Sequence, residues 1–523
     1  MSTATGPADF FTQPFRRPRA ISRHAFLVMG LFVAACGTGG DSGQAPNTPL
    51  TTPMALVVNQ DDTTLTTLRL DGKNVPVIGT LSLGPVQADA IGGVTFSLGE
   101  WIFVTNTVTN KVAAIDPIGG LAPILESFLD VNPQNPLVRL GQRPTRIYRY
   151  PGDKEILLTM NEGHPVIGPG HDTVRGCPNG GSATVLHNSH LSAGGEKPRV
   201  TTTVCLSGTG EHLAAFSTGP TATAPNRTEL AFVSSKTTGI ISLLLADPSY
   251  DAVRWSEFIV KIDLCDSAEE QALLFPACDG TVTTPNHAAP AGMFWSQATE
   301  KIYVYLSGYG SVVEIDPDTF SITRTVDITP PLPSQTVFHS VGLTPNGRSL
   351  FLVGEDLASD PTMAIGRFGS VDLTAPVLSA TELSFPQLSG IRPSRFQFTP
   401  DGARIYMTQS NDAGGLNAAQ AQNLRRDLLF IFDPSFIFLV SELALPSAAT
   451  HGMDLWITGP QGAGSARGVV VTNATPGVNG TVSLIDAATN TISATIPVGR
   501  NPKQVTVYYV GLAASDNQAT PIW

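Results

Sequence analysis

The sequence repeats one pattern of short β-strands along most of its length, and this periodicity constrains the fold more than any other feature. The clearest copy is the last one, GVVVTNATPGVNGTVSLIDAATNTISATIPVGRNPKQVTV, in residues 468–507. It contains three short strands of alternating hydrophobicity and a fourth that begins after Pro502. The same order recurs from Trp101, Glu229 and Lys301. Units of this length bury a hydrophobic core only by packing against their neighbours, so the sequence indicates a repeat fold.

Weaker copies begin at Ala55, Glu155, Ser349 and Arg404, which gives eight units in total. The first unit lacks a leading strand, whereas the strand 505–510 is left over at the other end of the repeats. In propellers such terminal strands commonly share one blade, which closes the ring and leaves no exposed sheet edge at the seam. We therefore predict an all-β fold, a single β-propeller of eight blades closed by N- and C-terminal strands in one blade. Seven blades is the alternative, if one weak unit is an insertion.

The repeats resemble the YVTN family of β-propellers, whose units have a strand ending in Val-Thr-Asn, a strand ending in Ile-Asp and a third ending near Val-Gly. The last unit matches this pattern at 471–473, 485–486 and 498–499, and the resemblance covers nearly all of the chain after about residue 54. It implies a propeller domain over 54–511, followed by a C-terminal tail at 512–523. The resemblance specifies architecture and says little about chemistry.

The N-terminal region is typical of an export signal. Arginines at 16, 17, 19 and 23 precede a short apolar segment at 25–35, which is well below the roughly 20 residues that span a bilayer. The segment Val-Ala-Ala-Cys at 33–36 resembles a bacterial lipobox. We predict a signal peptide at 1–35, lipidation of Cys36 and a flexible tether at 36–53, on a protein of the bacterial outer membrane that faces either the periplasm or the cell surface. An ordinary signal peptide with an incidental cysteine is the alternative.

The remaining cysteines and the charge fit an exported domain. Four cysteines follow Cys36, and each pair brackets one local excursion of the chain, so we predict disulfides Cys177–Cys205 and Cys265–Cys278. Free buried thiols are the alternative. The formal net charge of −12 argues against a nucleic-acid partner, because a phosphate backbone requires a basic face.

Long insertions follow the second strand of several units. They occupy 161–181, 354–368, 410–427 and 473–480. In a propeller these loops open on the same face as the start of each innermost strand, so we expect one loop-rich face around the mouth of the central channel. Within the third insertion, the pattern at 418–428 predicts a short helix that acts as a lid or brace.

Three histidines share one predicted position at this mouth. Aligning the units on their first hairpin places His212, His339 and His451 just inside the innermost strands of units four, six and eight. The other units have Gly92, Thr145, Ala291, Ser394 and Lys503 there. Converging neutral imidazoles could bind copper or zinc and leave a coordination position open, and His287 could lean over the same mouth. The alternative is structural, with each imidazole bonded to a nearby backbone carbonyl.

Other polar residues lie on the loops of the same face. Glu162, His164, His171, Glu355, Asp356 and Asp412 are candidate ligand-binding residues. Their carboxylates could ligate calcium or act as general bases, whereas acidic loops often serve only solubility.

The sequence therefore favours a non-enzymatic, lipid-anchored extracytoplasmic scaffold. It would bind a protein, polymer or small molecule through the loop-rich face and the channel mouth, and would touch the membrane only through its lipid. The first alternative is a metal-dependent oxidoreductase with copper or zinc at the three histidines. The second is a lactone hydrolase, since some lactonases resemble these repeats, although no matching catalytic motif is present. The oligomeric state stays open.

Overall fold

The computed structural model divides the chain into two units, Met1–Thr48 and Pro49–Trp523, and every described residue belongs to the second unit. The residues described are 52–70, 77–87, 91–96, 101–116, 124–130, 143–149, 156–163, 181–187, 199–206, 210–219, 224, 229–247, 254–264, 288–328, 336–434, 438–457 and 466–510. The predicted signal peptide, the lipidation site at Cys36 and the tail at 512–523 lie outside them.

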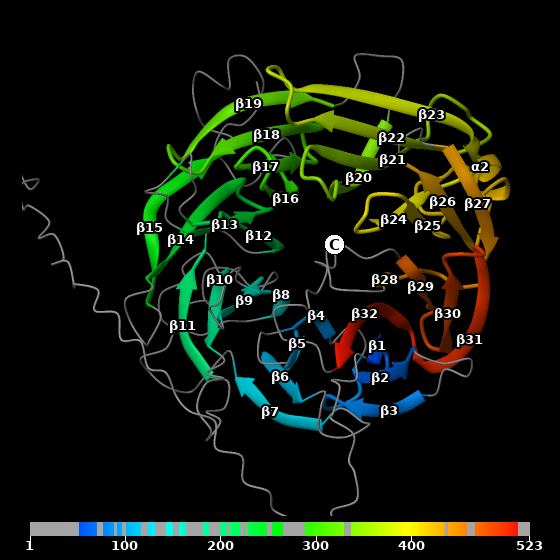
Figure 1. Ribbon diagram of the computed structural model, residues 1–523, viewed down its shortest axis with the longest axis horizontal. Helices are drawn as coiled ribbons and strands as arrows, with labels where there is room; N and C mark the ends of the chain where they lie inside the picture. The colour runs from blue at the N-terminus through cyan, green and yellow to red at the C-terminus, as the bar shows by residue number, and fades with distance from the viewer. Residues whose placement is uncertain are drawn as a thin grey trace, which may run out of the picture. The chain divides into compact units, whose positions relative to one another are not determined.

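The described strands form eight four-stranded antiparallel sheets, which are the blades of a β-propeller (Figure 1). Blade 1 contains β1 (Thr52–Asn59), β2 (Thr64–Arg69), β3 (Val77–Ser82) and β32 (Pro502–Val510). Blade 2 contains β4 (Ile91–Phe96), β5 (Ile102–Asn106), β6 (Lys111–Asp116) and β7 (Ile124–Asp130). Blade 3 contains β8 (Pro144–Arg149), β9 (Ile156–Asn161), β10 (Ser182–His187) and β11 (Arg199–Cys205). Blade 4 contains β12 (His212–Phe216), β13 (Leu230–Ser235), β14 (Ile240–Asp247) and β15 (Arg254–Asp263).

The second half of the ring repeats this arrangement. Blade 5 contains β16 (Pro290–Ser296), β17 (Lys301–Leu306), β18 (Ser311–Asp316) and β19 (Ser321–Asp327). Blade 6 contains β20 (Thr336–Leu343), β21 (Ser349–Asp356), β22 (Ile365–Asp372) and β23 (Ser379–Ser389). Blade 7 contains β24 (Pro393–Phe398), β25 (Ile405–Gln409), β26 (Leu428–Asp433) and β27 (Phe438–Ala444). Blade 8 contains β28 (Met453–Ile457), β29 (Ala466–Asn473), β30 (Asn479–Asp486) and β31 (Thr491–Arg500).

The predicted eight-bladed ring and its mode of closure are confirmed. In blade 1 the last strand, β32, pairs antiparallel with the first, β1, from Thr52 opposite Val510 to Asn59 opposite Pro502. The strands β32, β4, β8, β12, β16, β20, β24 and β28 are the innermost of their blades and surround the central channel (Figure 1). Because β32 completes blade 1, the ring has no unpaired strand edge at its seam.

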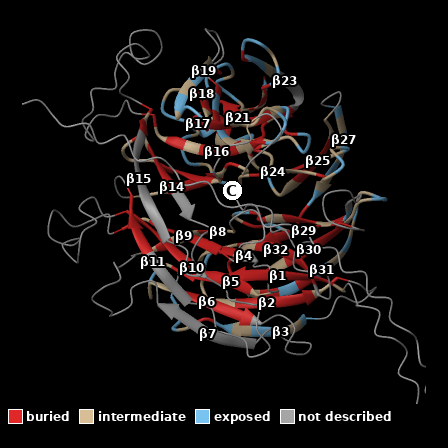
Figure 2. Ribbon diagram, turned by 60° about the vertical axis from the view of Figure 1, so that its left-hand side comes forward, coloured by how far each residue is buried: buried red, intermediate tan, exposed pale blue. Residues whose placement is uncertain are grey.

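The core lies between the blades. Strands in the middle of a blade, such as β5, are buried along their length, whereas the outermost strand β27 alternates exposed and half-buried residues (Figure 2). A middle strand has a neighbouring blade on each side, so both of its faces become apolar. Phe232 of blade 4 and Val304 of blade 5 belong to one such hydrophobic cluster.

The repeated asparagine at the end of the second strand has a consistent structural role. In blade 8, Asn473 donates from Nδ2 to the hydroxyls of Thr481 (2.9 Å) and Ser483 (3.0 Å) on the third strand. The same contacts join Asn59 to Thr64 and Thr66, and Asn161 to Ser182 and Thr184. A buried amide needs such partners, which explains why the asparagine and the hydroxyl residues recur together in the sequence.

The interior helix is shorter than predicted. Helix α2 covers Ala418–Gln422 instead of 418–428, with Asn417 and Gln420 forming a capping box at its start. The helix cannot continue because β26 begins at Leu428 and the preceding Asp427 has a positive φ of 56°. No helix within the described part of the chain is both long and apolar enough to cross a membrane.

Only one of the predicted disulfide cysteines lies in a described segment. Cys205 is buried at the end of β11, whereas Cys177, Cys265 and Cys278 lie outside the described residues. Both pairings therefore stay predictions.

Candidate ligand site at the channel mouth

The residues predicted to ring the channel mouth do lie at the entrance of the innermost strands. His212 is the first residue of β12, His339 is the fourth residue of β20, and His451 lies two residues before β28. The other five (Gly92, Thr145, Ala291, Ser394 and Lys503) are the second residues of their strands.

A β-bulge separates His339 from the other two histidines. The strand register shifts around His339, between Phe338 and Ser340, as it does at the entrance of five further blades. In blade 4, by contrast, His212 pairs directly with Ser235, and the register around His451 is also unbroken. A bulge redirects the side chain that it carries, and accordingly His339 is exposed whereas His212 and His451 are buried.

The environment of His451 fits the structural alternative. Its Nδ1 lies 3.2 Å from the carbonyl oxygen of Thr472, and its Nε2 lies 3.8 Å from Oδ1 of Asp427. Burial lowers the pKa of His451, although the Thr472 contact and the Asp427 charge oppose that shift. A carbonyl can only accept, so the neutral ring donates from Nδ1.

The structure does not bring the three histidines together as a metal-binding group. His212 and His451 belong to blades 4 and 8, which lie on opposite sides of the ring (Figure 1). Within the segments that the structure describes, no three histidine, cysteine, aspartate or glutamate side chains are arranged to hold a metal ion. The predicted copper or zinc site, and the calcium alternative, therefore have no geometric support there. His287 lies outside the described residues.

The predicted carboxylates on the loops of blades 6 and 7 are engaged with protein groups. Arg392 contacts Glu355 through Nε to Oε2 (2.6 Å) and Nη2 to Oε1 (2.7 Å), a two-pronged pair. Asp356 is fully buried against Arg367 (2.7 Å); burial opposes its ionisation, but hydrogen bonds from Ser359 and the Arg367 contact hold its pKa down at about 2. These carboxylates stabilise the loops.

The remaining predicted loop residues give a similar result. The side chain of Asp412 accepts a hydrogen bond from the Gly414 amide at 2.8 Å. Glu162 lies 3.6 Å from Arg143. His164 and His171 lie outside the described residues.

The two insertions of blades 6 and 7 are locked together into one rim, as the predicted brace requires. Gln420 of α2 donates to the carbonyl oxygens of Leu357 (2.8 Å) and Asp360 (3.0 Å), both on the blade 6 insertion. Arg392 donates to the carbonyl oxygens of Asp412 (2.6 Å) and Gly414 (2.8 Å) as well as to Glu355. Side-chain donors that satisfy loop carbonyls hold a loop in one conformation, so this part of the mouth is preorganised.

Two arginines occupy the same position on opposite innermost strands. Arg146 follows Pro144 and Thr145 in β8, and Arg395 follows Pro393 and Ser394 in β24. Blades 3 and 7 lie across the channel from one another (Figure 1). The pKa of Arg395 is lowered by burial and, in addition, by repulsion from the Arg146 charge. The two guanidinium charges are therefore close enough to repel each other.

The anionic partner at this site is Glu211, just before β12. Its carboxylate contacts Arg146 and, at 2.9 Å, Nζ of Lys236. Burial would raise the pKa of Glu211, but the two cations hold it below its usual value. One carboxylate thus faces two cations, and Arg395 pairs with no carboxylate among the described residues. These four described side chains together carry net positive charge, on a chain whose formal net charge is −12.

Sequence reasoning did not select these arginines. The shared triplets Pro-Thr-Arg at 144–146 and Pro-Ser-Arg at 393–395 were a usable signal, because they repeat at one register position. The middle residue of each triplet, Thr145 or Ser394, corresponds to the histidine position and is uncharged.

The fold and site define an eight-bladed β-propeller with two arginines on opposite innermost strands. No family model and no curated protein matches the chain, so the resemblance to YVTN repeats stays a prediction. Among solved structures it is similar to the dihydro-heme d1 dehydrogenase NirN, with 12% identity over 90% of this chain and 78% of that one and a TM-score of 0.52. Sqt1 of Saccharomyces cerevisiae is similar at 11% identity over 87% and 94%, also with a TM-score of 0.52. At such identities the likeness shows the fold alone.

Proposed function

We propose that this chain is a binding protein of the bacterial cell envelope, tethered through a lipid on Cys36, and that the mouth of its central channel is the ligand site. The observation that carries the proposal is the guanidinium of Arg395. It lies half-buried on an innermost strand, where no described carboxylate neutralises it. A charge kept in such a place has a cost in stability, and a site for a ligand is a reason to retain it.

The neighbouring rim supports a binding role. Arg392 and helix α2 fix the insertions of blades 6 and 7 beside the inner strand that carries Arg395. A fixed rim reduces the conformational entropy that a ligand would have to remove on binding. The lipobox-like segment at 33–36 supports the envelope location.

A ligand screen with mapping of the bound surface tests the proposal. The full-length purified protein is screened by thermal shift against amino acids, sugars, carboxylates, nucleotides and short peptides, and each binder is mapped by hydrogen exchange. We expect at least one class to stabilise the protein and to protect the rim around Arg392 and Asp412. Protection confined to the opposite face, at the hairpin that contains Gly402, would overturn the assignment, and so would the absence of any binder.

A further inference from the structure

We propose that the channel binds one small ligand that carries two separated oxyanion groups, carboxylate or phosphate, with one group on Arg395 and the other on Arg146. The proposal rests on the proposed function above and names the ligand class of that site. It follows from three features of the innermost strands: which side chains occupy one level of the channel, how the two arginines are placed, and how their charge is balanced.

The first feature is the set of residues that occupy the same place as the two arginines on the eight innermost strands, which we call the arginine level of the channel. The strand register places five residues at it: Arg146, Leu213, Gly292, Ser340 and Gln504. Gly452, which accepts from the Thr472 amide, and the bulge residues Gly93 and Arg395 hold the corresponding places in the other three blades, which gives eight residues. Two of the eight are charged, and both are positive. An anionic group that enters this level meets cationic donors from two directions.

The glycines of this level bring the innermost strands close together. A Cβ on Gly292 would lie 2.3 Å from Cγ1 of Val341, and one on Gly452 would lie 2.3 Å from the carbonyl oxygen of Lys503. Both positions therefore exclude side chains because the adjacent inner strand occupies the space. The polar side chains of this level come from four of the eight blades, and the two arginines are the charged ones.

The second feature is the opposition of the two arginines. The two arginines belong to blades 3 and 7, which lie on opposite sides of the axis. A ligand with two anionic ends can therefore contact both arginines more readily than a single small anion can. Each guanidinium has a planar fork of donors that fits the two oxygens of a carboxylate or phosphate. A ligand that bridges the channel would match both forks at once.

The third feature is the charge balance. Glu211 is shared between Arg146 and Lys236, so it does not cancel the positive charge on its side of the channel. Arg395 has Arg146 as its charged neighbour, and the repulsion between them lowers its pKa beyond the effect of burial. Two bound anionic groups would replace that repulsion with attraction, so a dianion gains more than a monoanion does.

Calorimetric titration of the full-length protein tests this inference. The probes are linear dicarboxylates of increasing chain length, the corresponding monocarboxylates, inorganic phosphate and pyrophosphate. We expect one dianion to bind at least tenfold more tightly than its monoanionic counterpart, with an optimum length in the dicarboxylate series. A preference for pyrophosphate would identify phosphate as the ligand chemistry, and a length optimum among dicarboxylates would identify carboxylate.

Four variants assign the effect to the two arginines. Arg395→Gln and Arg146→Gln should each weaken the preferred dianion at least tenfold and remove its advantage over the monoanion. Arg395→Lys keeps the positive charge but lacks the planar pair of guanidinium donors, so this variant should bind the dianion with intermediate affinity. Arg404→Gln is the matched control, because Arg404 belongs to the same blade but lies at the hairpin end, beside Asp433 (3.4 Å), and should leave binding unchanged.

The outcomes separate this inference from the proposed function. If no dianion binds, or if Arg395→Gln binds it as tightly as the parent does, the inference is overturned. If another class of compound from the screen still protects the rim at Arg392, the proposed function stands without it. If neither dianions nor any other class binds at the mouth, both fail. Melting temperatures of all variants confirm that each is folded.

Discussion

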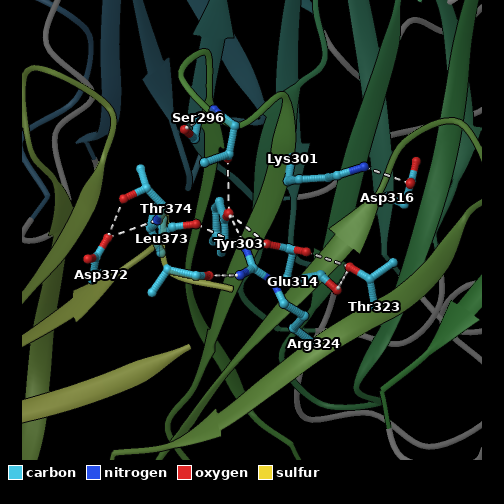
Figure 3. Close-up of polar contacts among 12 residues, drawn as sticks. Ser296, Lys301, Tyr303, Glu314, Asp316, Thr323, Arg324, Asp372, Leu373 and Thr374 are labelled. Carbon is cyan, nitrogen blue, oxygen red and sulfur yellow. Dashed lines mark hydrogen bonds and ion pairs between the residues drawn. The ribbon is translucent and has the colours of Figure 1, made fainter. Parts of the chain in front are cut away.

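The carboxylate of Glu314, deep in blade 5, contacts the guanidinium of Arg324 on the outermost strand of the same blade, and that guanidinium extends to blade 6 (Figure 3). Tyr303 (2.7 Å) and Thr323 (2.6 Å) also donate hydroxyl hydrogen bonds to Glu314. Arg324 in turn donates to the carbonyl oxygen of Leu373 in blade 6, at 3.0 Å. A single buried acid therefore anchors an arginine that links two adjacent blades.

Replacing Arg324 should be strongly destabilising. In Arg324→Met the charge of Glu314 stays buried without its cationic partner, which costs about 3–5 kcal/mol of unfolding free energy. Lys301→Met is the control, because the Lys301–Asp316 pair (2.6 Å) is partly exposed and should contribute less than about 1 kcal/mol. Urea unfolding midpoints measure both. Equal losses in the two variants would contradict the role assigned to Glu314.

The repeated asparagine can be tested in blade 8. Asn473→Ala leaves the hydroxyls of Thr481 and Ser483 without their amide donor and removes a buried polar contact, so we expect a loss of about 1–3 kcal/mol. Asn346→Ala, in the exposed turn after β20, should cost clearly less. The comparison uses the same urea titration. A neutral Asn473→Ala variant would show that the recurrent asparagine is not needed for stability.

Stability should depend on pH through His451. Burial lowers its pKa in the folded protein, while the unfolded chain has a value of about 6.5 and takes up the proton first. The contribution of His451 to stability is therefore complete above about pH 6.5 and decreases as the pH falls toward the lower folded pKa. His451→Gln should reduce the difference in unfolding midpoint between pH 7.5 and pH 5.5. An unchanged difference would exclude His451 as a source of the pH dependence.

The pKa of His339 should depend on the charge of Arg392. His339 is exposed at its surface, but the surrounding protein removes part of its hydration and lowers this pKa; the Glu355 charge raises it, and the Arg392 charge lowers it. Arg392→Gln removes the repulsion and leaves Glu355 unpaired, so the pKa of His339 should rise. An NMR titration of labelled histidines measures it, with His339→Gln to identify the resonance and Arg404→Gln as the distant control. A decrease would show that Glu355 moves away once Arg392 is lost.

The proposed lipid anchor predicts a specific effect of replacing Cys36. Cys36→Ala should abolish incorporation of an alkyne-labelled fatty acid and shift the protein from the membrane to the soluble fraction. Ser42→Ala, in the predicted tether, should change neither. Retention of the label in Cys36→Ala would contradict lipidation at this residue.

The fold was predictable because its information is local and repeated. The short strands of the unit at 468–507 recur in the same order along the chain, and the leftover strand at 505–510 indicated how the ring closes. The number of blades followed from counting units, and the structure confirms it. Helix α2 was predicted too long because Asp427 and the start of β26 impose a turn that depends on tertiary contacts, such as Asn411 to Asp427 (2.6 Å).

The site was less predictable because it depends on the register between strands and on the ring. The sequence places His212, His339 and His451 at one position. The structure has a bulge at His339 but not at His212 or His451, and this difference decides which imidazoles are buried. Arg146 and Arg395 lie on opposite blades only because the number of blades is even, so that blade 3 has blade 7 opposite it. Neither property can be read from a single unit.

The closure of blade 1 by β32 has a consequence for how the protein matures. Synthesis proceeds from the N-terminus, so β1, β2 and β3 are present well before the inner partner of β1, Pro502–Val510, has been made. Until then the ring is open, and the backbone groups on the inner edge of β1 have no partner strand. Such an edge can pair with a strand of another chain. A stop codon just before Pro502 would thus remove a small fraction of the chain and yet leave every molecule in this vulnerable state.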